Sequence, residues 1–166
     1  LMHIYLIEAG PRLLAGMSEE SSAHAEQFLR EMGVNILLNK RVVDYRDHKV
    51  VLEDGTEIAT RTFIWVSGVT GVTIGNLDAS LIGRGGRIKV DSFNRVEGMN
   101  NVFAIGDQCI QLADENYPNG HPQLAQVAIQ QGELLAKNLI RMEKGQEMKP
   151  FHYRNLGSMA TVGRNR

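Results

Sequence analysis

Short apolar runs and one helical pattern alternate in the first part of the chain. Residues 3–7 form an apolar run that ends before a Gly-Pro pair, which predicts a buried strand. Ser18 suits a helix N-cap because two glutamates follow it in the first turn, where the helix dipole favours acids. Apolar residues then recur at helical spacing as far as Gly33, a suitable C-terminal stop. Residues 34–38 predict a second strand.

The pattern changes to short strands and tight turns after residue 41. Residues 42–45, 50–52 and 56–58 are β-prone runs separated by polar turns, which predicts an antiparallel meander. Residues 62–66 (Thr-Phe-Ile-Trp-Val) predict a further apolar strand, with Trp65 in its core.

The second half contains a glycine-rich region and then one long helical pattern. Residues 83–86 lack the Gly-x-Gly-x-x-Gly spacing of a phosphate loop, so a plain turn is expected. Residues 102–105 predict a strand buried on both faces. A helix is expected from His121-Pro122 to about Arg141. Alternating strands and helices predict an α/β fold: a Rossmann-like parallel sheet with the meander as an antiparallel insertion.

Composition narrows the functional classes. The chain has 166 residues, 43% of them hydrophobic and 22% charged, and its formal net charge is -1. This balance gives no basic surface for a nucleic acid. His24, His48 and His152 show no metal-ligand spacing with each other or with acids, so no metal site is predicted. One cysteine, Cys109, excludes a disulfide within the chain and suits a reducing, cytoplasmic compartment.

The Gly106-Asp107 pair is the first motif that carries chemistry. It follows the apolar run 102–105, and ligands bind at the carboxyl ends of strands in open α/β sheets. Glycine allows a ligand to approach the backbone, and a carboxylate can accept hydrogen bonds from sugar hydroxyls. The alternative is a core strand that ends in an ordinary turn. Cys109 has no partner cysteine and is interpreted as a small packing residue.

The predicted helix after His121 is the second candidate. Its N-terminal amides would favour an anion or the pyrimidine edge of a flavin. Gln126 and Gln130 are four residues apart and therefore share one face. The alternatives are a solvated glutamine face and, for His121, a loop-lining residue rather than a general acid. No residue is a certain catalyst.

Glu8 ends the first predicted strand. In a dinucleotide fold, an acid at this point binds the adenosine ribose and disfavours a 2′-phosphate, about 20 residues after the glycine-rich phosphate loop. Seven residues precede Glu8, so we expect this loop upstream of residue 1 and the chain to be an internal fragment. The alternative is a glutamate in an ordinary loop.

Four runs together resemble the type II NADH dehydrogenases, the single-subunit NADH:quinone oxidoreductases of the two-dinucleotide-binding-domain flavoprotein (pyridine nucleotide-disulfide oxidoreductase) superfamily. They occur in family order and span nearly the whole chain. The runs are residues 7–14 (IEAGPRLL), 64–69 (IWVSGV), 101–108 (NVFAIGDQ) and 125–132 (AQVAIQQG). Residues 157–163 (GSMATVG) add a narrower signal.

The resemblance implies two partial dinucleotide-binding domains. Residues 1–70 would belong to the NADH-binding domain and residues 71–166 to the C-terminal part of the FAD-binding domain. It further implies a role for each candidate residue. Glu8 would hold the NADH ribose, Gly68 would lie near the nicotinamide, Gly106 and Asp107 would bind FAD, and Gln126 and Gln130 would face the flavin and quinone pocket.

The implied activity is an FAD-dependent transfer of hydride from NADH and of electrons onward to a quinone. The parent enzyme would lie at the cytoplasmic face of the membrane, associated through a segment beyond this chain. The chain alone would be inactive and would bind little FAD or NADH, and its cut sheet edges would favour a homodimer. The alternatives are a flavoprotein reductase with a ferredoxin- or rubredoxin-type acceptor, and a non-catalytic nucleotide-binding module.

Overall fold

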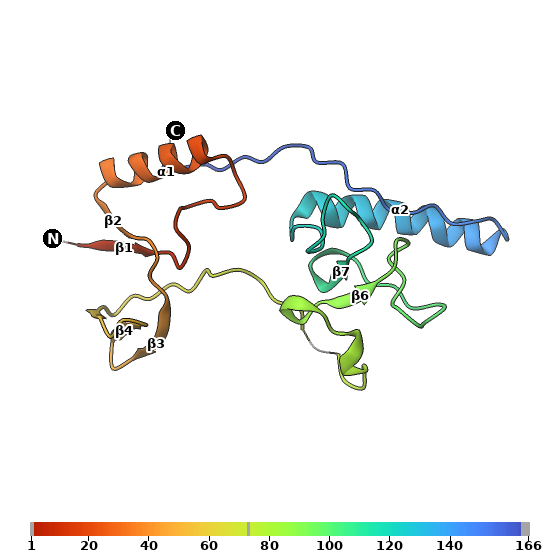
Figure 1. Cartoon of the computed structure of the whole chain (residues 1–166), viewed down its shortest axis with the longest axis horizontal. Coiled ribbons are helices and arrows are strands. Elements are labelled where there is room, and N and C mark those ends of the chain that lie inside the picture. The colour runs from red at the N-terminus through yellow and green to blue at the C-terminus, as the bar shows by residue number, and fades with distance from the viewer. Residues whose placement is uncertain (1, 73, 164–166) are drawn as a thin grey trace. The chain divides into compact units, whose positions relative to one another are not determined.

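The structure, a computed structural model, describes residues 2–72 and 74–163 and divides the chain into two compact units (Figure 1). The first unit contains the residues up to 66 together with those from 157 onward, and the second contains residues 67–156. Parallel strand pairs, helices and an antiparallel sheet confirm the predicted mixed α/β class.

The first unit begins with a parallel β-α-β arrangement, as the apolar pattern predicted. Strand β1 (Ile4–Ile7) pairs in parallel with β2 (Val34–Leu37), and helix α1 (Glu19–Glu31) connects them. The Ser18 side chain accepts a hydrogen bond from the amide of Ser21 and so caps α1. The chain reverses after the helix at a glycine with positive φ.

A three-stranded antiparallel meander completes this unit, again as predicted. Its strands are β3 (Val42–Arg46), β4 (Lys49–Leu52) and β5 (Glu57–Ala59), with β4 in the centre. Val50 and Leu52 of the central strand are buried.

The strand predicted at residues 62–66 is wrong. These residues are extended but belong to no ladder, and Ile64 and Val66 are 75% and 84% exposed. Trp65 is 60% exposed and is therefore no core residue. Phe63 alone is half-buried, where its ring stacks on Tyr45 with centroids 4.8 Å apart. An apolar run becomes a strand only where a neighbouring strand pairs with it, and this segment has none in the described residues.

The second unit is built on another parallel pair, β6 (Ile88–Val90) and β7 (Cys109–Gln111). Three short 3₁₀ turns surround it: η1 (Ala79–Leu81), η2 (Arg84–Gly86) and η3 (Gly106–Gln108). The plain turn expected at residues 83–86 is confirmed by η2. The buried core of the unit consists of Ile88, Val90, Val96, Ala104 and Cys109.

The buried strand predicted at residues 102–105 is misplaced. Phe103 makes one isolated antiparallel bridge with Arg95, and Val102 is 43% exposed. The strand that enters the parallel sheet is β7, which begins only after the Gly106-Asp107 turn. The motif therefore precedes a sheet strand instead of ending one.

Helix α2 (Ala125–Glu143) is the longest element of the second unit. It begins three residues after Pro122, later than predicted, and Leu124 occupies its N-cap position without a side-chain cap. Its buried positions, Val127, Gln131 and Asn138, form one stripe, and two of the three are amides. The last part of the unit runs back beside α2, and Asn138 bonds both the amide and the carbonyl of Lys149.

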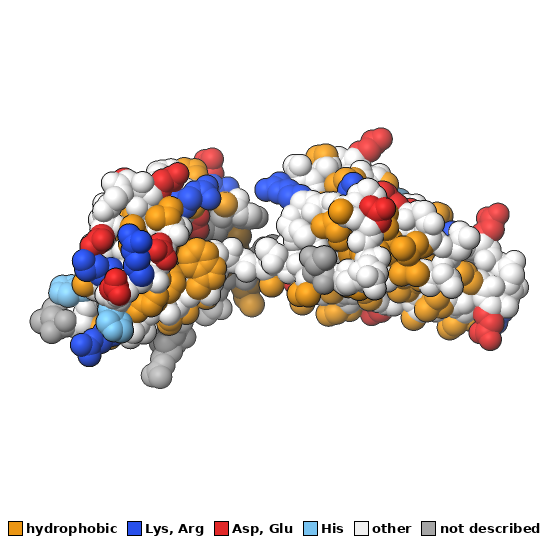
Figure 2. Space-filling model, turned by 90° about the horizontal axis from the view of Figure 1, so that it is seen from below, with side chains coloured by type: hydrophobic (Ala, Val, Ile, Leu, Met, Phe, Trp, Pro, Cys, Tyr) orange, Lys and Arg blue, Asp and Glu red, His pale blue; other side chains and the backbone are white. Residues whose placement is uncertain are grey.

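Hydrophobic side chains are spread over the visible face of the second unit in Figure 2. Exposed large hydrophobic residues on α2 are Ile129, Leu139, Ile140 and Met142. Apolar surface of this kind is commonly covered by a partner or by another part of a protein. Among the described residues, no helix combines the length and the apolar character needed to cross a membrane.

Candidate functional site

The Gly106-Asp107 turn lies directly on helix α2. Gly106 has φ +65°, a conformation that favours glycine. Its amide donates to Gln131 Oε1 at 2.7 Å, and a Cβ added at Gly106 would lie 3.2 Å from the Cβ of Ala128. Glycine at this position therefore permits both the turn and its close approach to the helix.

Asp107 is exposed on this turn. Its main-chain oxygen accepts a hydrogen bond from Gln123 Nε2 at 3.2 Å. The next residue, Gln108, bonds the main chain of Val72 twice, through Nε2 to the oxygen at 2.6 Å and through Oε1 to the amide at 3.1 Å. The turn is thus held on both sides, while the carboxylate faces solvent, where it could accept hydrogen bonds from hydroxyl groups.

A buried guanidinium lies behind the turn. Arg87 donates from Nε to the Cys109 oxygen at 2.6 Å and from Nη2 to the His121 oxygen at 3.0 Å. It thereby joins β7 to the segment that precedes α2. Burial lowers the pKa of Arg87, and nearby Cys109 and Asp107 act in the opposite direction. Arg87 could not be singled out from the sequence, because its partners are 22 and 34 positions away.

Cys109 is buried, with 1% of its surface exposed, which confirms its predicted packing role. Its Sγ lies 3.4 Å from the Gly106 oxygen and 3.7 Å from Gln131 Oε1, and it receives a weak contact from Asn94 Nδ2 at 3.8 Å. Burial raises the pKa of the thiol, an effect that Arg87 partly opposes. A neutral buried thiol is a poor nucleophile, so Cys109 contributes packing to the turn.

His121 is 2% exposed and anchors the loop before α2. Its Nε2 lies 3.0 Å from Asp114 Oδ2, and this hydrogen bond lowers the pKa of Asp114. The His121 ring also contacts the rings of Tyr117, Phe151 and Tyr153, at centroid distances of 5.1, 5.2 and 5.8 Å. These contacts give His121 a structural role in the loop.

Gln126 and Gln130, the glutamines predicted to face a ligand, bind the main chain of a segment that follows α2. Gln126 Oε1 accepts the amide of Leu156 at 2.9 Å. Gln130 accepts the amide of Arg154 at 3.0 Å and donates to its oxygen at 2.9 Å. The two side chains do lie on one face of the helix, and that face carries the segment containing residues 154–156.

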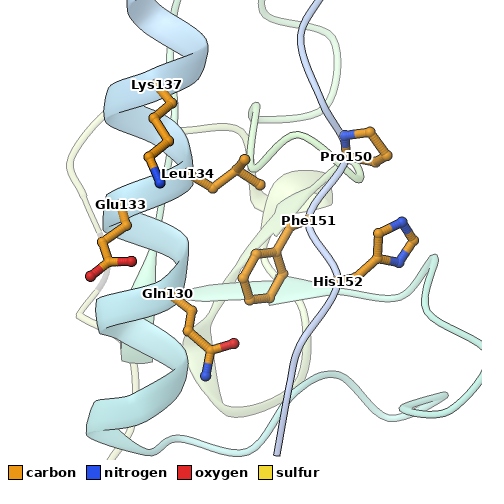
Figure 3. A pocket seen from close by; sticks show the side chains of 7 residues that line it. All are labelled: Gln130, Glu133, Leu134, Lys137, Pro150, Phe151 and His152. Atoms are coloured by element: carbon orange, nitrogen blue, oxygen red, sulfur yellow. The ribbon is translucent and has the colours of Figure 1, made fainter.

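An open cleft of about 280 Å³ lies between α2 and the returning segment (Figure 3). Phe151 points toward the helix in this view, and its ring is buried. The cleft also contains the charged side chains of Glu133 and Lys137. Its lining residues are Gln130, Glu133, Leu134, Lys137, Pro150, Phe151 and His152.

The remaining candidates lie in different units. Glu8 directly follows β1, and its Oε1 accepts the amide of Gly10 at 2.7 Å. The Glu8 main chain also bonds Leu37 and Lys40, which fixes the start of the loop after β1. Gly68 belongs to the second unit and has φ +101°. Gly106, Asp107 and the two glutamines thus all belong to the second unit, whereas Glu8 belongs to the first.

Sequence reasoning missed the buried polar side chains Arg87, Asn94 and Gln131. Each is 9% exposed or less, and each bonds main chain or Cys109 far away in sequence. A buried polar residue needs such partners. In the described residues no group of three or more His, Cys, Asp or Glu side chains could hold a metal ion.

Curated relatives confirm the resemblance drawn from the sequence. A type II NADH:quinone oxidoreductase of Haemophilus influenzae is 30% identical over 162 residues, which is 97% of this chain and 36% of the relative. One of Staphylococcus aureus is 32% identical over 164 residues, which is 96% of this chain and 40% of the relative. The chain thus spans less than half the length of these relatives.

Solved structures show the same fold. The structure of NDH2 from Plasmodium falciparum in complex with NADH has a TM-score of 0.80 at 18% identity. The alignment covers 98% of this chain and 48% of that one. A ferredoxin reductase from Rhodopseudomonas palustris has a TM-score of 0.71 at 19% identity, over 91% of this chain and 37% of that one.

A family assignment follows from the sequence itself. Residues 2–132 match the family described as pyridine nucleotide-disulphide oxidoreductase. The match extends from β1 through the Gly106-Asp107 turn and into α2, so it includes most of the candidate site. The chain belongs to the pyridine nucleotide-disulphide oxidoreductase family.

Proposed function

We propose that this chain is part of a type II NADH:quinone oxidoreductase, an FAD-dependent enzyme that takes hydride from NADH and passes electrons to a quinone. The observation that carries the proposal is the match, along at least 96% of the chain, to relatives of that name. The chain covers 36–40% of those relatives, so the activity belongs to the complete enzyme.

The Gly106-Asp107 turn has the features expected of one part of an FAD site. A side chain at position 106 would meet Ala128, so glycine is what lets this turn lie directly against the N-terminal part of α2. The exposed Asp107 carboxylate can accept hydrogen bonds from the hydroxyl groups of the FAD sugar-alcohol chain. When bound, the flavin would supply the hydride and electron chemistry, while the protein orients it and excludes competing reactions.

Gln126 and Gln130 would form the wall of the flavin and quinone pocket. Gln130 uses one acceptor and one donor position with Arg154, and a carboxamide has one more of each. It could therefore bind a quinone oxygen without giving up the segment that it holds. Polar atoms of this kind orient an apolar ligand in its pocket.

Residues 1–70 would form a NADH-binding region and residues 71–166 the FAD-binding part. Within the first region, Glu8 would bind the NADH ribose. The Oε1 atom of Glu8 is engaged by the Gly10 amide, but a carboxylate accepts about four hydrogen bonds in total. The second oxygen can accept from a ribose hydroxyl. A 2′-phosphate would meet the negative charge of Glu8, which favours NADH over NADPH.

We propose that the complete enzyme acts at the cytoplasmic face of the membrane, because a quinone acceptor is dissolved in lipid.

We also propose that the isolated chain forms a homodimer. Ile4 and Tyr5 of β1 are 48% and 46% exposed, an apolar surface that a larger sheet or a second copy would cover. Light scattering tests this point: a monomer at micromolar concentration would contradict it.

The principal test uses the gene product that contains this chain. Purified protein should carry FAD and reduce a soluble quinone analogue with NADH, and faster than with NADPH. Electron transfer to ferredoxin or rubredoxin, with none to quinone, would favour a protein acceptor. A gene product without flavin would refute the proposal. Residues 1–166 alone should be inactive, and a micromolar affinity for NADH in calorimetry would indicate a separate nucleotide-binding module.

A further inference from the structure

Gln131 is a buried amide in the middle of α2 that none of the roles above requires. Its side chain is 1% exposed, among the most completely buried in the chain. Burying a carboxamide costs free energy unless its polar atoms are bonded, so such a residue is retained where the bond is useful. The partner of Gln131 Oε1 is the amide of Gly106, 25 residues away in sequence.

This bond replaces a missing cap. The 3₁₀ turn η3 begins at Gly106, and Ile105, at its N-cap position, provides no side-chain hydrogen bond. The first amides of a helical turn have no partner within the turn. Gln131 Oε1 accepts the first of them at 2.7 Å, and the Cys109 thiol lies 3.7 Å from the same oxygen. The cap of η3 therefore comes from helix α2.

The residue that this arrangement fixes is Asp107. The Gly106 amide immediately before it is bonded to Gln131, and its own carbonyl is bonded to Gln123 Nε2 at 3.2 Å. Ala128 packs against Gly106, with 3.2 Å between its Cβ and a Cβ placed on the glycine. Held from both sides, the main chain of Asp107 has little freedom, so the point and direction at which its side chain leaves the backbone are set in advance.

We propose that Gln131 is a positioning residue that holds Asp107 for hydrogen bonding to the sugar-alcohol hydroxyls of FAD. The inference rests on the proposed function, because it requires Asp107 to bind FAD. Gln131 itself is buried behind the turn and acts only through Asp107. A site whose acceptor is fixed before binding loses less conformational freedom when the ligand arrives, which raises affinity.

The test measures the FAD dissociation constant of the apoprotein, prepared from the full gene product, by flavin fluorescence titration. Q131M keeps the length of the side chain and removes the acceptor, and it should weaken FAD binding roughly ten-fold, as expected for the loss of one hydrogen bond to a positioned group. D107A should weaken binding as well. In the double variant, Q131M should add nothing further, because its effect passes through Asp107.

Two controls separate positioning from general destabilisation. Q131E keeps an oxygen acceptor and should recover most of the affinity lost in Q131M. N138L removes another buried amide of α2, one that bonds Lys149 and not the turn. N138L should lower the melting temperature of the apoprotein and leave FAD affinity unchanged.

The outcomes discriminate between the two proposals. If the wild-type apoprotein binds FAD but Q131M binds it equally well, or if Q131M and D107A act additively, the positioning role is overturned and the proposed function stands. Equal losses of FAD affinity in Q131M and N138L would also overturn it, because the effect would then be one of stability. A wild-type apoprotein that binds no FAD overturns both proposals.

Discussion

Two glycines in the second unit adopt the same left-handed backbone but have different surroundings. Gly106 and Gly145 both have φ +65°. A Cβ at Gly106 would lie 3.2 Å from Ala128, whereas a Cβ at Gly145 would meet no atom within 4 Å. Alanine at Gly145 should cost about 1 kcal/mol from backbone strain alone. Alanine at Gly106 should cost about 1 kcal/mol more, because the crowded helix must also shift.

Urea unfolding of G106A and G145A measures this difference directly, since the strain is common to both variants. An equal loss of stability would mean that α2 yields to the added methyl group without cost. Because Gly106 precedes Asp107, G106A should also weaken FAD binding in the gene product, and G145A should not.

The Asp114 carboxylate should give the second unit a pH-dependent stability. Its hydrogen bond with His121 lowers its pKa in the folded state. The contribution is therefore complete above the ordinary carboxyl pKa of about 4 and is lost as the pH falls below it, through the lower folded-state value. D114N removes the titration, so the stability gap between wild type and D114N should narrow between pH 5 and the acid limit of folding. A gap that stays constant with pH would contradict the role assigned to this bond.

Single residues were predictable where their chemistry depends on immediate neighbours in the chain. Gly106 and Asp107 are adjacent, and the sequence singled out this pair, although as the end of a strand and not as a turn that precedes one. Arg87 and Gln131 could not be singled out, because a buried polar side chain is explained only by its partners, which lie 22 to 34 residues away. The ligand roles of all the candidate residues, from Glu8 to Gln130, remain predictions.

Individual elements depend on local signals to different degrees. Helix α1 begins at its predicted cap, where Ser18 Oγ accepts the amide of Ser21 at 3.1 Å. S18A should therefore destabilise the first unit by about 1 kcal/mol. S18D keeps an acceptor and should stay within a few tenths of a kcal/mol of wild type. Thermal unfolding followed by circular dichroism compares them, and equal losses in both variants would show that the cap contributes nothing.

Strands that pair with a neighbour in the sequence were easier to predict than strands whose partners are distant. The meander was found because each of its strands pairs with the next across a short turn. Residues 62–66 and 102–105 have the composition of buried strands, yet a strand forms only where a partner pairs with it. The parallel pairs β1–β2 and β6–β7 join segments separated by an intervening helix or many turns. Hydrophobic periodicity does not reveal which of several apolar runs takes such a partner.

At the scale of the whole molecule, the chain consists of two units, each with its own parallel strand pair and its own buried residues. Each unit also leaves large apolar side chains exposed, among them Tyr5 in the first and Ile129 in the second. Two-stranded sheets have little independent stability, and parallel sheets are normally covered on both faces. The proposed complete enzyme would supply that cover, so the isolated chain should be less stable than the same residues in the gene product.

Limited proteolysis can compare two exposed arginines that differ in how their main chain is held. Arg61 and Arg154 are both exposed and lie outside helices and strands. Gln130 holds the main chain of Arg154 at both its amide and its oxygen. Arg61 instead precedes the extended residues 62–66, whose side chains are largely exposed. Because a protease must bind an extended segment, trypsin should cut first at Arg61. Mass spectrometry identifies the products, R61Q should abolish the early cut, and a first cut at Arg154 would mean that Gln130 does not secure the segment beside α2.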